Sequence, residues 1–246
     1  MSSLDSLKIA NNKARLCEFA TVNGLGSPRF KKLDKLADLH TAAEALGFPT
    51  HPVVLKPDTG TGSQGVKVIH NRLNPGWRLI DRNNREVEMF EVERWLAELS
   101  VWPSMHLYEY LPGVEYSVDV LCKEGEVLAH VTRLRHTSFY GMATHAQVVN
   151  EPLIAELACR IIAKIGLSYV VNVQFKCDLD GNPKLMEINP RIPGTIGLTV
   201  AAGVNMPYLA IKLALGEMIE TGLPMIGLHI MRYWTGIYRV DNEILS

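Results

Sequence analysis

Apolar residues recur at helical spacing in several separate segments of the chain, which predicts helices over residues 6–23, 33–47, 92–99, 151–166 and 208–220. The fourth segment has the clearest pattern. Pro152 lies in its first turn, the apolar residues between Leu153 and Ile165 share one face, and Gly166 ends it. This helix should therefore bury its apolar face against another layer of structure.

Alternation of apolar and polar residues predicts strands over 118–122 and 127–131, and over 169–176 and 184–188. The polar stretch 71–85 is expected to be loop and turn. Between Arg133 and Ala146 the periodicity is weak, so we also expect a loop there. Arg133, Arg135, His136 and His145 would then lie on an exposed polar loop, with a substrate loop as the alternative. The chain is therefore expected to contain both helices and β-strands.

The segment 52–69 places a glycine-rich loop between two strand-like runs. Phosphate oxygens need closely spaced backbone N–H donors, and glycines remove side chains that would hold a phosphate away. Lys56 adds a positive charge. The loop itself contributes Gly60, Gly62, Ser63 and Gly65. Because a strand rather than a helix follows, this is neither a Walker loop nor a dinucleotide-binding turn. The pattern predicts a flap that closes over phosphate, with an ordinary glycine-rich hairpin turn as the alternative.

A second hairpin is predicted around Asp180-Gly181, a common two-residue turn. This turn places Gln174 opposite Glu187 and Asn172 opposite Asn189. Side-chain alternation then puts these four polar residues on one face. The other face would carry Val171, Val173, Phe175, Met186 and Ile188. One face of the hairpin is therefore expected to be core and the other rich in oxygen atoms.

The polar face of this hairpin has the ligand chemistry of a hard cation. Opposed Cβ atoms lie about 4.5–5.5 Å apart, so Gln174 and Glu187 can contact one ion. Carboxylate and amide oxygens, with water and nucleotide phosphates, suit Mg²⁺. Arg191 continues the same face, and its guanidinium can clamp a transferring phosphoryl group. The alternative is a solvated outer face of an edge hairpin.

Composition excludes several classes of function. The 246 residues are 47% hydrophobic and 21% charged, and the formal net charge of −1 offers no basic field for nucleic acid. There is no apolar run of the roughly 18–20 residues that a membrane span needs, and the first residues do not form an export signal. We therefore expect a soluble, cytoplasmic protein with no nucleic-acid or membrane partner.

The cysteines and histidines are scattered along the sequence. The four cysteines form no Cys-x-x-Cys pair, which favours reduced, mostly buried thiols over a zinc site or a redox dithiol. The eight histidines form no His-x-x-x-His pair on a predicted helix. A transition-metal site built from histidine is therefore not expected.

Four motifs occur in an order that resembles the ATP-grasp superfamily. They are Lys-Pro-x-x-Gly-x-Gly-Ser-x-Gly-Val from Lys56, the segment 108–119, Asn-Val-Gln at 172–174, and Glu-Ile-Asn-Pro-Arg at 187–191. The chain is particularly similar to short proteins that correspond to one half of the carbamoyl-phosphate synthase large subunit. In those proteins Asn-Pro-Arg is followed by an apolar residue and Pro-Gly or Gly-Gly, which here is Ile192-Pro193-Gly194.

This resemblance implies an α+β ATP-grasp fold, in which two α/β subdomains with antiparallel sheets enclose a nucleotide cleft. Residues 1–25 would form a linker helix, 26–107 a small lid subdomain with the glycine-rich flap, and 108–246 a larger subdomain with the metal-binding hairpin. ATP-grasp enzymes usually carry a preceding N-terminal α/β domain. We expect that domain to be absent from this chain.

The resemblance also implies roles for individual residues. Lys13 and Lys56 would hold the nucleotide phosphates beneath the flap. Glu109 would accept a hydrogen bond from the adenine amino group, the backbone of Tyr110 and Leu111 would read the ring edge, and Glu115 would bind the ribose. As alternatives, Glu109 and Glu115 are solvated strand residues and Lys13 is a surface lysine.

For the metal, the resemblance implies that Gln174, Glu187 and Asn189 bind Mg²⁺, with Mn²⁺ as the alternative ion. Arg191 would stabilise phosphoryl transfer together with Lys56.

The expected function is that of an ATP- and Mg²⁺-dependent ligase module, which activates a carboxylate as an acyl phosphate for attack by an amine or another nucleophile. Carbamoyl phosphate is not the expected product, because Gly194 stands where those synthases continue with an arginine. Two alternatives remain open: a non-catalytic or partner-dependent nucleotide-binding module, and a kinase that releases its phosphorylated acid. The expected partners are small carboxylates and amines, with a homodimer or a chain that supplies the N-terminal domain as a further expectation.

Overall fold

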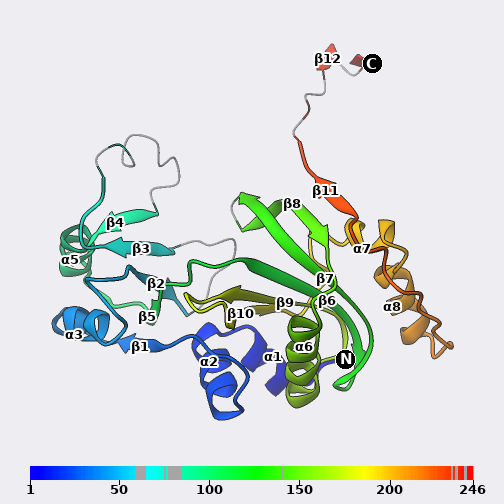
Figure 1. Cartoon of the computed structure of the whole chain (residues 1–246), viewed down its shortest axis with the longest axis horizontal. Helices are drawn as coiled ribbons and strands as arrows, with labels where there is room; N and C mark the ends of the chain where they lie inside the picture. The colour runs from blue at the N-terminus through cyan, green and yellow to red at the C-terminus, as the bar shows by residue number, and fades with distance from the viewer. Residues whose placement is uncertain are drawn as a thin grey trace.

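The computed structural model describes residues 1–58, 65–74, 76, 85–139, 141–233, 235, 238–240 and 243–245. Two β-sheets lie side by side with helices packed against them (Figure 1). The smaller sheet has the strand order β1-β5-β2-β3-β4 and is antiparallel except for the parallel pair β3–β4. Its strands are β1 (Phe30–Leu33), β2 (Val53–Pro57), β3 (Lys67–His70), β4 (Glu86–Glu88) and β5 (Met105–Glu109).

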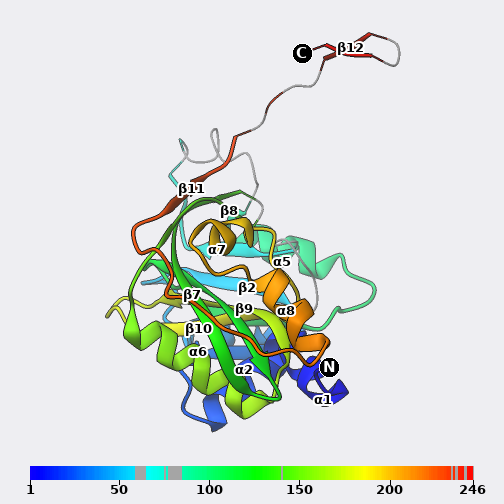
Figure 2. The same cartoon turned by 90° about the vertical axis from the view of Figure 1, so that its right-hand side faces the viewer.

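The larger sheet is antiparallel throughout, with the strand order β10-β9-β6-β7-β8-β11. Its strands are β6 (Glu115–Lys123), β7 (Glu126–Phe139), β8 (Met142–Val148), β9 (Tyr169–Cys177), β10 (Pro183–Asn189) and β11 (His229–Met231). A short ribbon of β12 (Tyr238–Val240) and β13 (Glu243–Leu245) stands away from both sheets (Figure 2).

Helices cover both faces of the larger sheet. One core contains apolar residues of α6 and of strands β6, β9 and β10, and a second core joins α7 and α8 to the opposite face. The smaller sheet packs against α3 and α5. The helices are α1 (Leu4–Ala10), α2 (Lys13–Val22), the 3₁₀ helix η1 (Leu36–Asp38), α3 (Leu39–Glu44), α5 (Met89–Ala97), α6 (Pro152–Ile165), α7 (Gly197–Ala201) and α8 (Met206–Ala214). None of the described helices is long and apolar enough to cross a membrane.

The helix α6 confirms the strongest prediction from sequence. Its buried residues repeat at helical spacing from Ile154 to Ile165, and Pro152 lies in its first turn. Gly166 ends it in the left-handed conformation with φ of 74°, which costs a glycine little. The four cysteines are unpaired thiols, and only Cys159 is not fully buried, as the sequence indicated.

Several predicted elements have different boundaries. The helix expected over 6–23 is two helices, because the Asn12 side chain accepts a hydrogen bond from the Arg15 N–H and starts α2 afresh. The helix expected over 33–47 is shorter: Leu33 pairs with β5 instead, and the helical part consists of η1 and α3 and ends at Glu44. The last helix starts at Met206 and ends at Ala214, just before Gly216 with φ of 76°. Of the predicted loop 71–85, residues 75 and 77–84 lie outside the described part of the chain.

The segment 133–146, predicted to be a loop, is instead most of the β7–β8 hairpin. Two irregularities in pairing, between Arg135 and Thr137 and between Thr137 and Ser138, disturb its alternation. Its face toward the other sheet is also polar, so the apolar positions that mark a strand are few. For these reasons the sequence pattern did not predict this hairpin.

The chain crosses from β5 to β6 through a hinge at residues 110–114. The Gly113 N–H donates to the Cys177 carbonyl at 3.0 Å, and the Cys177 N–H donates to the Val114 carbonyl at 2.9 Å. A Cβ atom on Gly113 would lie 2.7 Å from the Cys177 Cβ and 2.8 Å from its carbonyl oxygen. Close backbone contact thus holds the hinge against the end of β9.

Replacing Gly113 with alanine should lower the free energy of unfolding by about 1–3 kcal/mol, because the added methyl group must displace backbone of β9. Urea unfolding of both proteins measures this difference. Gly197→Ala is the matched control, since no atom lies within 4 Å of the Cβ position there. Equal unfolding midpoints for the two variants would contradict the close-packed hinge.

Candidate functional site

A cavity of about 560 Å³ lies between the two sheets and is lined by residues of both. Most of the residues singled out in the sequence surround it. These are Lys13, Lys56, Glu109, Tyr110, Leu111, Glu115, Gln174, Glu187, Asn189 and Arg191. Gly60, Gly62 and Ser63 lie outside the described residues. Gly65 is described, with φ of 70° and Pro57 side-chain atoms 3.2–3.3 Å from its Cβ position, but it does not line the cavity.

The smaller sheet supplies an apolar wall to this cavity. Alternation along β2 turns Val53 and Leu55 into the core under the sheet, while Val54 faces the cavity. The wall continues through Val66, Val68 and Tyr108. A flat apolar surface beside polar groups is what a heteroaromatic ring requires of a binding site.

Lys56 extends from β2 into the same cavity. Its Nζ lies 4.9 Å from the centre of the Tyr108 ring, within the range of a cation–π contact. The pKa of Lys56 is lowered to about 8, chiefly by burial; Cys17 and the charge of Glu187 raise it, while the charges of Lys13 and Lys176 act in the same direction as burial. Lys56 of one sheet and Glu187 of the other therefore interact across the cavity.

The hairpin β9–β10 has the predicted register around the site. Gln174 pairs with Glu187 and Asn172 with Asn189, on the face toward the cavity. The pairing shifts between Leu185 and Glu187, so the intervening Met186 is not in the core as predicted but lines the cavity. This β-bulge turns one more side chain toward the site than strict alternation allows.

The hairpin oxygens are held in a fixed arrangement. The Asn189 amide nitrogen donates to Glu187 Oε1 at 2.8 Å, and the Gln174 amide nitrogen donates to Asn172 Oδ1 at 2.9 Å. Because the amide nitrogens make these bonds, the amide oxygens of Gln174 and Asn189 can accept from arginines or bind a metal ion. Arg191 Nη2 lies 3.4 Å from Asn189 Oδ1. This donor set of one carboxylate and two amides is hard and fits Mg²⁺.

Arg135 is a site residue that sequence reasoning placed on a loop. It lies on β7, and its Nη1 donates to Gln174 Oε1 at 2.8 Å and to Glu115 Oε1. Its Nη2 donates to the Gly141 carbonyl at 2.7 Å, at the tip of the β7–β8 hairpin. Arg135 therefore connects Glu115 and Gln174, which were predicted to bind ribose and metal. The spacing of Arg133 and Arg135, two residues apart, was the available signal that both share one strand face.

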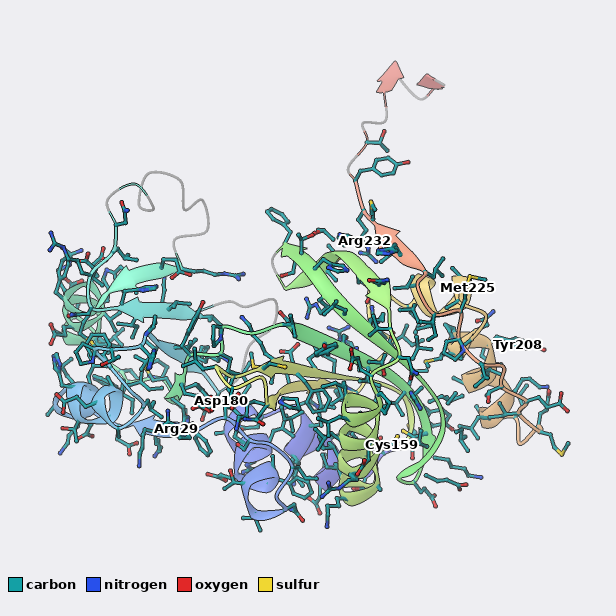
Figure 3. All side chains as sticks on the ribbon, in the orientation of Figure 1. Arg29, Cys159, Asp180, Tyr208, Met225 and Arg232 are labelled. Carbon is teal, nitrogen blue, oxygen red and sulfur yellow. The ribbon has the colours of Figure 1, made fainter. Side chains whose placement is uncertain are left out.

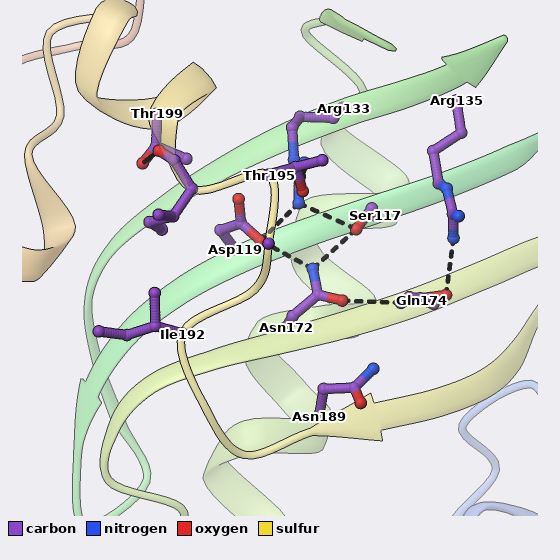
Figure 4. A network of polar contacts seen from close by, with 12 residues as sticks. Ser117, Asp119, Arg133, Arg135, Asn172, Gln174, Asn189, Ile192, Thr195 and Thr199 are labelled. Atoms are coloured by element: carbon purple, nitrogen blue, oxygen red, sulfur yellow. Dashed lines mark hydrogen bonds and ion pairs between the residues drawn. The ribbon is translucent and has the colours of Figure 1, made fainter. Parts of the chain in front are cut away.

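Arg133 lies deeper, in a buried network at the centre of the larger sheet (Figure 4). Its Nη2 contacts Asp119 Oδ1 at 2.7 Å, and the two side chains are 1% and 0% exposed. The Asn172 amide also donates to Asp119 Oδ1, at 2.7 Å. Arg133 Nη1 reaches Thr195 in the segment after β10. Burial raises the pKa of Asp119, and the charge of Arg133 opposes that shift.

At the hinge end of the cavity, Arg29 holds both oxygens of Glu109. The Arg29 backbone N–H donates to Oε1 at 2.9 Å and its Nε donates to Oε2 at 2.7 Å. Arg29 precedes β1 (Figure 3), whose strand is the neighbour of β5. The carboxylate is therefore already oriented at the point where the two sheets meet.

Comparisons with known proteins identify the family and the fold. The profile of the family described as "ATP-grasp in the biosynthetic pathway with Ter operon" matches residues 102–232. Carbamoyl phosphate synthase large chains are similar in sequence: that of Thermomicrobium roseum is 24% identical over 87% of this chain and 19% of its own length. That of Clostridium perfringens is 21% identical over 98% of this chain and 21% of its own length. The chain thus spans about a fifth of these relatives.

Solved structures share the fold. Carboxyaminoimidazole ribonucleotide synthase from Aspergillus clavatus, complexed with ATP, has a TM-score of 0.68 at 18% identity, over 88% of this chain and 54% of its own. An L-amino acid ligase from Bacillus licheniformis has a TM-score of 0.61 at 18% identity, over 87% of this chain and 50% of its own. With its two-sheet ATP-grasp fold and a family profile that covers more than half of its length, the chain belongs to this ATP-grasp family.

Proposed function

We propose that the chain is an ATP- and Mg²⁺-dependent ligase module that activates a carboxylate for attack by an amine or another nucleophile. One observation carries this proposal. A cationic side chain, Lys56, and an oxygen-rich pair, Gln174 and Glu187, extend from different sheets into one cavity. A bound triphosphate would contact the lysine of one sheet, and its metal ion would contact the oxygen atoms of the other. Neither sheet carries both groups.

The nucleotide would lie with its base against the apolar wall of Val54, Val68 and Tyr108. Glu109, fixed by Arg29, would accept from the adenine amino group, and the backbone of Tyr110 and Leu111 would meet the ring edge. Glu115 would receive the ribose hydroxyls. Lys13 and Lys56 would hold the phosphates, because an ammonium group near phosphate oxygens is favoured by charge.

The metal would be held by Glu187, Asn189 and Gln174. When bound there, Mg²⁺ supplies positive charge that offsets the charge of the phosphate oxygens. Arg135 donates to Gln174 Oε1, so this amide oxygen is already presented to a cation. Mn²⁺ prefers the same oxygen donors and would occupy the same site.

In the reaction, a carboxylate oxygen of the substrate would attack the γ-phosphorus of ATP, and the bond to the bridging oxygen of ADP would break. An amine would then attack the carbonyl carbon of the acyl phosphate, and inorganic phosphate would leave with the bonding electron pair. Lys56 and Arg191 would stabilise negative charge on the moving phosphoryl group. A closed cavity would keep water from hydrolysing the acyl phosphate.

The comparisons support this class of chemistry without giving the substrate. The similar solved structures include a biotin carboxylase domain in complex with MgADP and bicarbonate, with a TM-score of 0.66 at 19% identity. This neighbour, the carboxyaminoimidazole ribonucleotide synthase and the L-amino acid ligase are named for different compounds, so their names do not identify the acceptor of this chain. The acceptor of this chain is therefore proposed only as a small carboxylate, with an amine as the nucleophile.

The test is release of ADP over a panel of amino acids and small acids, each assayed with and without amines. We expect ADP release that depends on both an acid and Mg²⁺. Lys56→Ala and Glu187→Gln should each lower the rate by about 100-fold, since each removes charge stabilisation of the transferred group. Lys31→Ala and Glu156→Gln are matched controls, because both residues are exposed and lie outside the cavity.

The same assay separates the alternative functions. Tight binding of MgATP in calorimetry with no acid-dependent turnover would favour a nucleotide-binding module that needs another domain or chain. Release of a phosphorylated acid in the presence of amines would favour a kinase. Unchanged nucleotide binding and turnover in both Lys56→Ala and Glu187→Gln would overturn the site itself.

The affinity for MgATP should also fall as the pH rises above about 8. In the free protein Lys56 loses its proton near this pH, whereas bound phosphate would favour the charged form. The dissociation constant should therefore increase by about fivefold between pH 8 and pH 9, which isothermal calorimetry measures. Lys56→Arg should not show this increase, because a guanidinium stays charged throughout. Identical pH profiles for the two proteins would contradict the assignment.

A further inference from the structure

Three histidines from distant parts of the sequence meet on the larger sheet. His136 lies on β7, His145 on β8 and His229 on β11. One ring nitrogen of each lies within 4.8 Å of a ring nitrogen of the other two. His145 and His229 are separated by 84 positions, so sequence spacing gave no sign of the cluster.

The strand register explains why these side chains share one face. Ala146 is buried against α7 and α8, so its neighbour His145 points to the opposite face. On β7, Arg135 lines the cavity and the next residue, His136, turns away from it. His229 pairs with Gln147, two positions from His145 and on the same face. The cluster therefore lies on the side of the sheet away from the cavity.

The ring contacts are close. His145 Nε2 lies 3.0 Å from His229 Nδ1, and the His136 and His145 rings stack with centroids 4.3 Å apart. The His136 and His229 centroids are 6.0 Å apart. Nitrogen atoms bound to one tetrahedral Zn²⁺ at about 2.0–2.1 Å lie roughly 3.3 Å from one another, so small side-chain rotations would complete the site.

Three other histidines of the chain have carboxylate partners. His40 contacts Glu93, His70 contacts Glu86, and His106 Nδ1 lies 2.5 Å from Asp58 Oδ1. The three clustered rings instead contact one another, and their group of potential metal ligands contains no carboxylate among the described residues. Three imidazoles brought together in this way are a ligand set for zinc and related transition metals.

We propose that His136, His145 and His229 form a binding site for one Zn²⁺ ion or a related divalent transition metal, with water or a further ligand at the fourth position. This site differs from the oxygen-rich Mg²⁺ site in ligand type and in sheet face. Burial lowers the pKa of His145, and the two neighbouring imidazoles lower it further, which favours the neutral ring that metals bind.

A metal bound by the three histidines would cross-link strands β7, β8 and β11. It would fix β11, a strand of three residues, to the β7–β8 hairpin. Arg232 lies just beyond β11 (Figure 3) and on the other face: its backbone N–H donates to the Thr144 carbonyl at 2.8 Å, and its side chain contacts Met142 and Gly194. Met142 and Gly194 line the cavity. Metal binding on one face of the sheet would thus stabilise the part of the cavity wall that Met142 and Gly194 form on the other face.

The test is binding of Zn²⁺ and Co²⁺ to the full chain after treatment with a chelator. We expect one Zn²⁺ per chain in equilibrium dialysis, and for Co²⁺ the intense visible absorption of tetrahedral nitrogen coordination. His145→Gln and His229→Gln should each weaken zinc binding by about 100-fold or more, since loss of even an indirect partner costs about 10–100-fold. Zinc should also slow proteolysis after β11 in the wild type.

The controls separate this site from others. His130→Gln, on the same strand β7 but outside the cluster, should bind zinc like the wild type. Glu187→Gln should keep the Co²⁺ spectrum, because it alters only the oxygen-rich site. Absence of stoichiometric zinc, an octahedral Co²⁺ spectrum in the wild type, or undiminished binding in His145→Gln would each overturn the proposal. The wild-type spectrum decides the matter even if a variant fails to fold.

Discussion

The buried ion pair between Asp119 and Arg133 is the interaction on which the arrangement of the site depends. Both side chains are removed from water, and such a pair is strongly destabilising when one partner is lost, by about 3–5 kcal/mol. The pair joins β6 to β7, and Asn172 adds β9 to the same carboxylate oxygen. Three adjacent strands are thereby held in one register. Because a slip of one residue would turn every side chain to the opposite face, this register keeps Glu115, Arg135 and Gln174 in the cavity.

Because side chains alternate along each strand, one face of each sheet packs in a hydrophobic core and the other face lines the cavity. In the larger sheet, Val118, Val173 and Phe175 pack under α6, while the residues beside them face the cavity. The smaller sheet repeats this division, with Val53 and Leu55 in its core and Val54 and Lys56 toward the cavity. Neither sheet alone carries a complete site. The hinge at Gly113, held against Cys177, sets how the two halves face each other.

The sequence predicted the β9–β10 site well and the β7–β8 region poorly, for physical reasons. The turn at Asp180-Gly181 was predicted, but next to it the strands pair one residue away from the predicted register, with Phe175 opposite Leu185. The bulge at Met186 then brings Gln174 opposite Glu187. The pairing at the site therefore depends on this bulge as well as on the turn, whereas strict alternation along the sequence placed Met186 in the core. In β7, Arg133 and Arg135 are polar because they meet partners on other strands. Their burial is a tertiary property, so an apolar pattern could not reveal it.

The position of Arg135 links the two faces of the larger sheet. On the cavity side it donates to Gln174 and to the Gly141 carbonyl at the hairpin tip, while its sequence neighbour His136 contributes to the histidine cluster on the other side. A divalent ion at Gln174 Oε1 would compete with the Arg135 guanidinium for that oxygen. If the proposed nucleotide site fills, Arg135 must therefore share or release it, and the hairpin tip that it holds would respond. A metal that fixes His136 to β8 and β11 would limit how far this hairpin can move, because packed strands shift as units rather than as single residues.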